Sequence, residues 1–203
     1  MPREASDNLN SDNLLDNFDV ASARAGTLDV TITYLEMLTS PAAAPALLAG
    51  TQVIIAKTPT ISFYRYLYNT VGEPWLWYER RRLSDDALAR IVQDPKVHVH
   101  VLYVEGVPAG YGELDTRTPG QVELAYFGLM PEFIGRGVGK RFLQYLCETA
   151  WQSTWQEDIK VTRLWVHTCT LDHPRALSVY QSVGFVSYKQ TEHRIADPRV
   201  SSS

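Results

Sequence analysis

The stretch Leu129–Arg141, with the sequence LMPEFIGRGVGKR, joins an apolar strand pattern to an amphipathic helix pattern. Its glycines Gly135, Gly137 and Gly139 have no Cβ atom to hold a ligand away from the main chain, so successive N–H groups can point at one phosphate cluster. The N-terminus of the following helix adds the positive end of the helix dipole. The stretch therefore predicts a phosphate-binding loop between a strand and a helix.

Composition predicts one globular domain without a nucleic-acid or membrane partner. The chain has 203 residues, 45% of them hydrophobic, and a net charge of −4. We expect a domain over residues 27–196, a flexible or loosely docked extension over residues 1–26 and a disordered tail over residues 197–203. The acidic balance offers no basic surface, and no apolar stretch is long enough to cross a bilayer. We expect a cytoplasmic protein and leave a homodimer open.

The two cysteines do not predict a metal site. Cys147 and Cys169 stand at no metal-ligand spacing, which favours buried, reduced thiols over a disulfide or a zinc site. Cys147 lies on an apolar helical stripe and Cys169 has no obvious base nearby in sequence, so neither resembles an activated nucleophile.

Periodicity and turn residues indicate an α/β (α+β) order in which three strands precede a helix, a strand, a helix and a further strand. This order predicts a mixed sheet, antiparallel first and then with a parallel crossover, flanked by helices. The expected strands are Leu28–Leu38, Val97–Val104, Pro108–Asp115, Val122–Met130, Val161–Thr168 and Phe185–Tyr188. The expected helices are Pro41–Ala49 (short), Ile61–Val71 and Ser84–Gln93, with two more after the glycine loop and after Pro174.

Two common glycine motifs do not fit the loop. A nucleotide-binding P-loop needs a glycine in place of Ile134 and a serine or threonine in place of Arg141. The dinucleotide-binding fingerprint needs its third glycine at the position of Lys140. It also follows the first strand of its domain, whereas three antiparallel strands are expected before this loop. ATP, GTP and hydride chemistry are therefore disfavoured.

What remains resembles the GNAT family, the Gcn5-related N-acetyltransferases. The family loop, Gln/Arg-x-x-Gly-x-Gly/Ala after hydrophobic-x-Pro, is matched by Leu129-x-Pro131 and the segment Ile134–Gly139, with Ile134 in place of Gln or Arg. A second family pattern, Asn-x-x-Ala-x-x-x-Tyr-x-x-x-Gly-Phe, is matched from His173 to Phe185, with His173 in place of Asn. The resemblance covers roughly residues 97–188.

The resemblance implies a GNAT-like, mostly antiparallel sheet of six to seven strands, in which a splayed strand pair forms the acyl-CoA cleft. It implies an N-acetyltransferase that carries the acetyl group of acetyl-CoA to a primary amine, on a small molecule or a peptide, by direct attack in a ternary complex. The residues expected to bind acetyl-CoA are Phe127 and Leu129 through their main chains, Ile134, Gly135, Arg136, Gly137, Val138, Gly139, Lys140 and His173.

The resemblance also implies the catalytic residues. Tyr180 matches the family's general acid, whose phenol protonates the departing thiolate. Glu123 lies where several members carry a glutamate that deprotonates the amine, and Glu113 and His167 are the alternatives for this base. Tyr180 also fits a simple core position, and Glu123 also fits a solvent-facing strand position.

The sequence says least about the amine that accepts the acetyl group. Trp77, Tyr78 and Glu79 fall in a region that lines the acceptor side in the family, and a carboxylate beside aromatic faces suits an ammonium group. The arginines at 80–82 follow directly, so an acceptor with a carboxylate stays open. An alternative function, motivated by Ile134 and His173, is a non-catalytic acyl-CoA-binding module that contacts a protein partner, and a third is transfer from another acyl donor.

Overall fold

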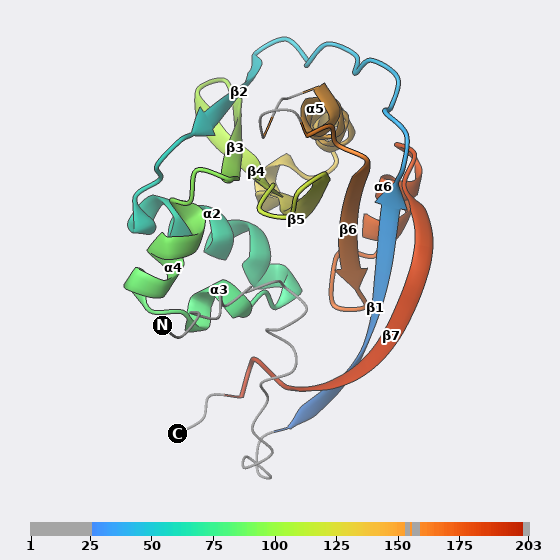
Figure 1. Cartoon of the computed structure of the whole chain (residues 1–203). Coiled ribbons are helices and arrows are strands. Elements are labelled where there is room, and N and C mark those ends of the chain that lie inside the picture. The colour runs from blue at the N-terminus through green and yellow to red at the C-terminus, as the bar shows by residue number, and fades with distance from the viewer. Residues whose placement is uncertain (1–25, 153–154, 156–158, 201–203) are drawn as a thin grey trace, which may run out of the picture.

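One seven-stranded sheet forms the centre of the protein. A computed structural model describes residues 26–152, 155 and 159–200 (Figure 1). The strand order is β2-β3-β4-β5-β6-β1-β7, and every neighbouring pair is antiparallel except β5 and β6, which are parallel. The strands are β1 (Thr27–Met37), β2 (Thr51–Ala56), β3 (Val97–Val104), β4 (Val107–Asp115), β5 (Gln121–Leu129), β6 (Arg163–Cys169) and β7 (Val186–Ala196). The predicted mixed, mostly antiparallel sheet is confirmed.

Helices lie on both faces of this sheet. They are α2 (Ile61–Gly72), α3 (Glu79–Arg82), α4 (Asp85–Val92), α5 (Val138–Gln152) and α6 (Ala176–Gln181), with short 3-10 turns η1 (Glu73–Trp75) and η2 (Pro131–Phe133). Figure 1 shows α2, α3 and α4 as one group, with α5 and α6 away from it. None of the helices in the described part of the chain is long and apolar enough to cross a membrane.

The hydrophobic interior consists of three clusters, and side chains of β5 and β6 belong to different ones because successive strand residues point to opposite faces of the sheet. Leu124 and Val166 belong to the α5 core, which packs under α5 and includes Tyr180 of α6. The α2 core lies beneath α2 and α4, and Tyr126 packs against it. The β1 core is smaller and holds Val30, Ile32, Tyr34, Trp165 and Ile195.

Local signals explain most of the elements. The Ser84 hydroxyl accepts a hydrogen bond from the N–H of Ala87 (3.2 Å), as expected of a helix N-cap. The predicted strand meander is present as β3, β4 and β5, and the turn between β3 and β4 places Glu105 and Gly106 at positive φ. The apolar stripe of α5, with Leu143, Leu146 and others, is buried.

Other expectations were wrong. The segment Pro41–Ala49 is not a helix. Pro41 and Pro45 lack an N–H, and the N–H of Ala44 instead donates to the Glu148 carboxylate (3.2 Å). Strand β2 was not predicted because half of its side chains are exposed and its pattern is short.

The last described residues extend beyond the predicted domain boundary. The N–H of Asp197 donates to the carbonyl of Gly26 (2.9 Å), and Val200 closes a turn onto Asp197. The predicted extension over residues 1–26 lies, apart from Gly26, outside the described residues, as does the segment 201–203 of the predicted tail.

Candidate functional site

Strands β5 and β6 pair only at their beginnings and then separate. The parallel register joins Gln121 to Arg163, Val122 to Leu164 and Glu123 to Trp165. Beyond these pairs a cavity of about 440 Å³ lies between the strands and the segments around them. Its walls include residues of all three clusters, so the cavity passes through the gap in the sheet from the α5 face to the opposite face.

A bulge in β5 marks the start of the gap. Glu113 of β4 faces Tyr126 while Leu114 faces Leu124, so Ala125 is the extra residue. Residues from Leu124 to Leu129 line the cavity, and those from Tyr126 onward pair with β4 on their other side only. Main-chain groups on the open edge of β5 are thus available to an extended ligand. The sequence predicted such a role for the main chains of Phe127 and Leu129, which lie in this part of β5.

The glycine loop borders the cavity on the α5 side. Gly135 (φ 83°) and Gly137 (φ 78°) adopt left-handed conformations, and a Cβ atom on either would meet no atom within 4 Å. Among the described residues, no hydrogen bond uses the N–H of Gly135 or Gly137, and the first N–H groups of α5 have no partner within the helix. The loop therefore has the conformation and the donors that a diphosphate needs.

The side chains of the loop divide into two groups. Ile134, Gly135, Gly137, Gly139 and Lys140 line the cavity. Arg136 and Val138 do not: the Arg136 guanidinium lies over the Phe133 ring, 5.1 Å from its centroid, and Val138 is buried in the α5 core. Lys140 is therefore the loop cation that faces the cavity.

Tyr180 lies where α6 meets the cavity. Its ring contacts Phe127 and Phe185, with centroid separations of 6.2 and 5.8 Å. Burial, with a smaller contribution from the negative charge of Asp172, raises the pKa of Tyr180 well above its usual value. The hydroxyl therefore holds its proton at neutral pH, as a general acid must.

The three candidate bases occupy different environments. Glu123 is 5% exposed at the point where the strands separate, and its Oε1 lies 3.8 Å from Nδ1 of His167. His167 lines the cavity and Glu123 does not. Glu113 is completely buried between Arg80 (2.7 Å) and the Tyr64 hydroxyl (2.5 Å), away from the cavity wall. Glu123 and His167 are therefore brought together, and Glu113 serves a buried ion pair.

The predicted acceptor residues share one side of the cavity, between η1 and α3. Trp77, Tyr78 and Glu79 all line it. The Tyr126 hydroxyl donates to Glu79 Oε2 (2.9 Å), and the rings of Trp77 and Tyr126 are 5.2 Å apart. Burial first, and then the Glu79 charge, raise the pKa of Tyr78 to about 12.

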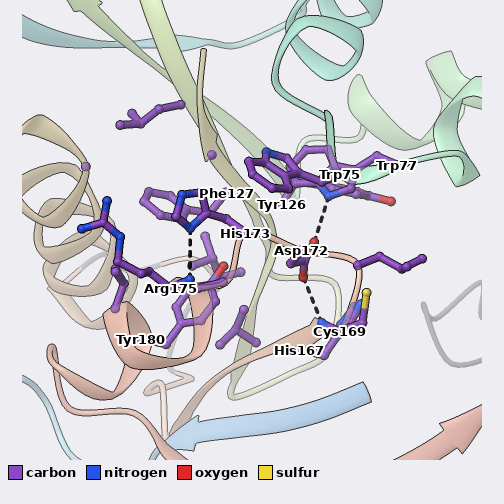
Figure 2. A pocket seen from close by; sticks show the side chains of 18 of the residues that line it. Trp75, Trp77, Tyr126, Phe127, His167, Cys169, Asp172, His173, Arg175 and Tyr180 are labelled. Atoms are coloured by element: carbon purple, nitrogen blue, oxygen red, sulfur yellow. Dashed lines mark hydrogen bonds between the residues drawn. The ribbon is translucent and has the colours of Figure 1, made fainter. Parts of the chain in front are cut away.

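Asp172 was missed by sequence reasoning, although it joins the two sides of the cavity. It accepts hydrogen bonds from the Trp77 indole N–H (3.2 Å), the Thr168 hydroxyl (2.7 Å) and the main chain of Cys169 (2.9 Å). Figure 2 shows Asp172 between Trp77 and the end of β6. The available signal was the local sequence context. An aspartate in the turn after a strand commonly accepts hydrogen bonds from the main chain of that turn.

His173 lies just before α6 and lines the cavity. Its Nδ1 accepts a hydrogen bond from the N–H of Arg175 (3.0 Å), the residue that precedes α6 (Figure 2). Its ring also lines the cavity and contacts the Trp75 ring, with centroids 5.0 Å apart. Arg175, which sequence reasoning did not single out, lines the same side.

Comparison with known proteins agrees with the split sheet and its glycine loop. The model of the acetyltransferase (GNAT) family matches residues 61–185. The chain therefore belongs to the GNAT acetyltransferase family. No curated protein sequence matches it.

Solved structures share the fold at low sequence identity. A GCN5-related N-acetyltransferase from Kribbella flavida is 18% identical, with 85% of this chain and 60% of that chain covered and a TM-score of 0.55. One from Sphaerobacter thermophilus is 15% identical (85% and 52% covered, TM-score 0.58), and an aminoglycoside acetyltransferase from an uncultured soil metagenomic sample is 12% identical (66% and 88% covered, TM-score 0.50). The chain thus spans 60% of the length of the protein from Kribbella flavida and 52% of the length of the protein from Sphaerobacter thermophilus.

Proposed function

We propose that this protein is an N-acetyltransferase that transfers the acetyl group of acetyl-CoA to a primary amine by direct attack in a ternary complex. The observation that carries the proposal is the cavity through the gap between β5 and β6. One side carries a glycine loop with free amide donors, and the other carries a carboxylate among aromatic rings.

The acyl donor is proposed to lie along the open edge of β5. The N–H groups from Gly135 to Lys140 would hold its diphosphate, and Lys140 would add a positive charge. The main chains of Phe127 and Leu129 would bond to its extended arm, as an added strand edge does. His173 would contact the donor from the α6 side.

In the proposed reaction, the amine nitrogen attacks the thioester carbonyl carbon, and the carbon–sulfur bond breaks. Glu123 accepts the proton that the amine loses, through His167 or a water, since His167 faces the cavity and Glu123 lies behind it. Tyr180 gives its proton to the departing sulfur. Glu123 thus accepts the proton that the amine loses, and Tyr180 supplies the proton that the thiolate gains.

The state of the cysteines supports direct attack. Burial raises the pKa of the Cys147 and Cys169 thiols to about 12 in each case, so both are protonated at neutral pH. A protonated thiol is a poor nucleophile, which disfavours a covalent acetyl-enzyme on either residue.

The proposal is tested by titrating the protein with acetyl-CoA in a calorimeter and by measuring thiol release with a panel of primary amines. We expect saturable binding and amine-dependent release of CoA, with the acetylated amine identified by mass spectrometry. Binding without transfer to any amine would support the non-catalytic module instead. No binding at all would remove the acyltransferase function.

A further inference from the structure

The wall of the cavity on the face opposite α5 is apolar. Strands β1 and β7 contribute Val30, Ile32 and Ile195, and the segments at either side contribute Tyr78, Cys169 and Leu171. All six belong to the β1 core or pack against it. Alcohol or amide groups of a ligand placed against this wall would lose water without gaining partners, so the wall favours a ligand with an apolar body.

The charged side chains on the cavity wall opposite α5 are carboxylates. Glu79 lies beside the rings of Trp77, Tyr78 and Tyr126, where an ammonium group finds both an opposite charge and aromatic faces. Asp172 adds negative charge, but its oxygens already accept three hydrogen bonds from the chain. The wall as a whole thus favours a cation over an anion.

The neighbouring arginines do not supply an anion site. Arg80 is held inside the molecule by Glu113, and the Arg81 Nε donates to Asn69 Oδ1 (2.9 Å). Arg82 lies over the Tyr78 ring, 4.6 Å from its centroid. None of the three lines the cavity, and its described lysine and arginine, Lys140 and Arg175, stand on the side of the glycine loop and α6.

We propose that the acceptor is a primary amine on an apolar, preferably aromatic, body that carries no acid group, with Glu79 as the residue that attracts its ammonium form. This inference rests on the proposed function and narrows its acceptor. It decides against the carboxylate-bearing acceptor that the arginines at 80–82 had left open. Amino acids place a carboxylate next to the amine, where Glu79 would repel it, and aminoglycosides place many hydroxyls against the apolar wall.

The experiment compares pairs of amines that differ only in a carboxylate. Thiol release is measured with acetyl-CoA and 2-phenylethylamine against phenylalanine, tryptamine against tryptophan, and kanamycin as a polar polycation. We expect kcat/KM for each arylalkylamine to exceed that of its amino acid by about 100-fold or more, because a carboxylate would be buried without a cationic partner. Equal or better turnover of phenylalanine or kanamycin would overturn the inference while leaving the proposed function intact.

A binding measurement separates the acceptor site from the chemistry. Calorimetric titration of the CoA-bound protein with 2-phenylethylamine and phenylalanine should detect binding of the first only. Binding of 2-phenylethylamine without thiol release from any amine would support the inference and overturn the proposed transfer. Failure of the CoA-bound protein to bind 2-phenylethylamine would overturn the inference.

A charge-removing variant tests the role of Glu79. Glu79→Gln keeps an acceptor for the Tyr126 hydroxyl but loses the negative charge, so KM for 2-phenylethylamine should rise about 10-fold with a smaller change in kcat. Glu192→Gln, which removes the same charge from an exposed position on β7 outside the cavity, is the control. Melting temperatures of both variants show whether folding is retained, and equal KM values in the two variants would contradict the role of Glu79.

Discussion

Tyr180 belongs both to a hydrophobic core and to the wall of the cavity. Its ring is packed by Phe127 and Phe185 in the α5 core, whereas the residue also reaches the cavity wall. A phenylalanine would fill the core equally well, so packing by itself does not require the hydroxyl. The residue is therefore a place where packing and chemistry can be measured separately.

Replacing Tyr180 by phenylalanine tests the proposed acid. Because the ring and its packing are kept while the proton donor is lost, kcat should fall about 100-fold with a small change in the affinity for acetyl-CoA. Steady-state thiol release gives kcat, and calorimetry gives the affinity. Tyr145→Phe, on α5 outside the cavity, is the matched control and should retain activity. An unchanged kcat in Tyr180→Phe would leave the residue a core position.

Glu123 is tested by removing its charge. Glu123→Gln should lower kcat by about 100-fold, since the amine would lose the group that accepts its proton. His167→Asn, which removes the ring that lies 3.8 Å away, should lower kcat as well if the proton passes through that ring. Full activity of Glu123→Gln beside an inactive His167→Asn would assign the base to His167 alone.

At the scale of elements, the glycine loop joins β5 to α5 through two left-handed residues. Gly137 and Gly106 provide a matched comparison, since their φ angles are 78° and 80° and a Cβ atom added to either would meet no atom within 4 Å. Gly106 lies in the turn between β3 and β4, outside the cavity. Strain and ligand binding can therefore be separated by one substitution at each site.

Gly137→Ala should weaken the binding of CoA, whereas Gly106→Ala should not. A left-handed alanine costs about 1 kcal/mol in either turn, so both variants should lose similar stability. Only the first shifts amide donors that face the proposed diphosphate. Denaturant unfolding measures the stabilities and calorimetry measures the affinities. Equal affinities for CoA in the two variants would contradict a role of the loop in binding.

The β3 strand carries a buried histidine that predicts a pH dependence of stability. His100 is fully buried, and burial lowers its pKa to about 4. The unfolded chain then binds a proton that the folded chain does not, so stability is complete above pH 6.5 and falls as the pH drops towards 4. By pH 5 the loss should be about 2 kcal/mol.

Urea unfolding at pH 7.5 and pH 5 checks this expectation. His100→Leu should lose less stability over this interval than the unchanged protein, by about the same 2 kcal/mol. His193→Gln, on β7, serves as a control for removing a histidine elsewhere. The same pH dependence in His100→Leu and in the unchanged protein would assign the effect to other groups.

The parts of the fold that were predictable are those with strong local signals. The Ser84 cap, the stripe of α5 and the glycine loop each follow from short patterns. Strand β2 and the coil before it depend on pairing with β3 and on the bond between Ala44 and Glu148, which are separated widely in sequence. Such partners are set by tertiary structure, so no local pattern predicts them.

The same distinction holds for the site. The loop and Tyr180 could be found because the family patterns are local. The proximity of Glu123 to His167 depends on the parallel pairing of β5 with β6, and the apolar wall from Val30 and Ile195 depends on β1 and β7. The joining role of Asp172 likewise required Trp77 to be brought to it from a distant segment.

At the scale of the whole molecule, a buried ion pair joins the helical group to the sheet. Arg80 of α3 donates to Glu113 of β4 (2.7 Å), and the Tyr64 hydroxyl of α2 donates to the same carboxylate. Burial first, and then the charge of Glu113, raise the pKa of Tyr64 well above its usual value, so this hydroxyl remains a donor. The pair joins α3, which begins at Glu79, to β4.

Breaking this pair should cost stability rather than chemistry. Glu113→Gln leaves the Arg80 charge buried without its partner and should lower the free energy of unfolding by about 3 kcal/mol. Denaturant unfolding measures the loss against Glu192→Gln, which should be near neutral. A stable Glu113→Gln protein whose kcat is abolished would instead return Glu113 to the candidate bases.

The central claim is that the gap between β5 and β6 holds acetyl-CoA, with its diphosphate on the glycine loop. A crystal structure of the protein with CoA tests it most directly. We expect phosphate oxygens within hydrogen-bonding distance of the amides between Gly135 and Lys140, and the extended arm beside Phe127 and Leu129 in the gap. CoA bound elsewhere, with the gap closed by protein side chains, would contradict the claim.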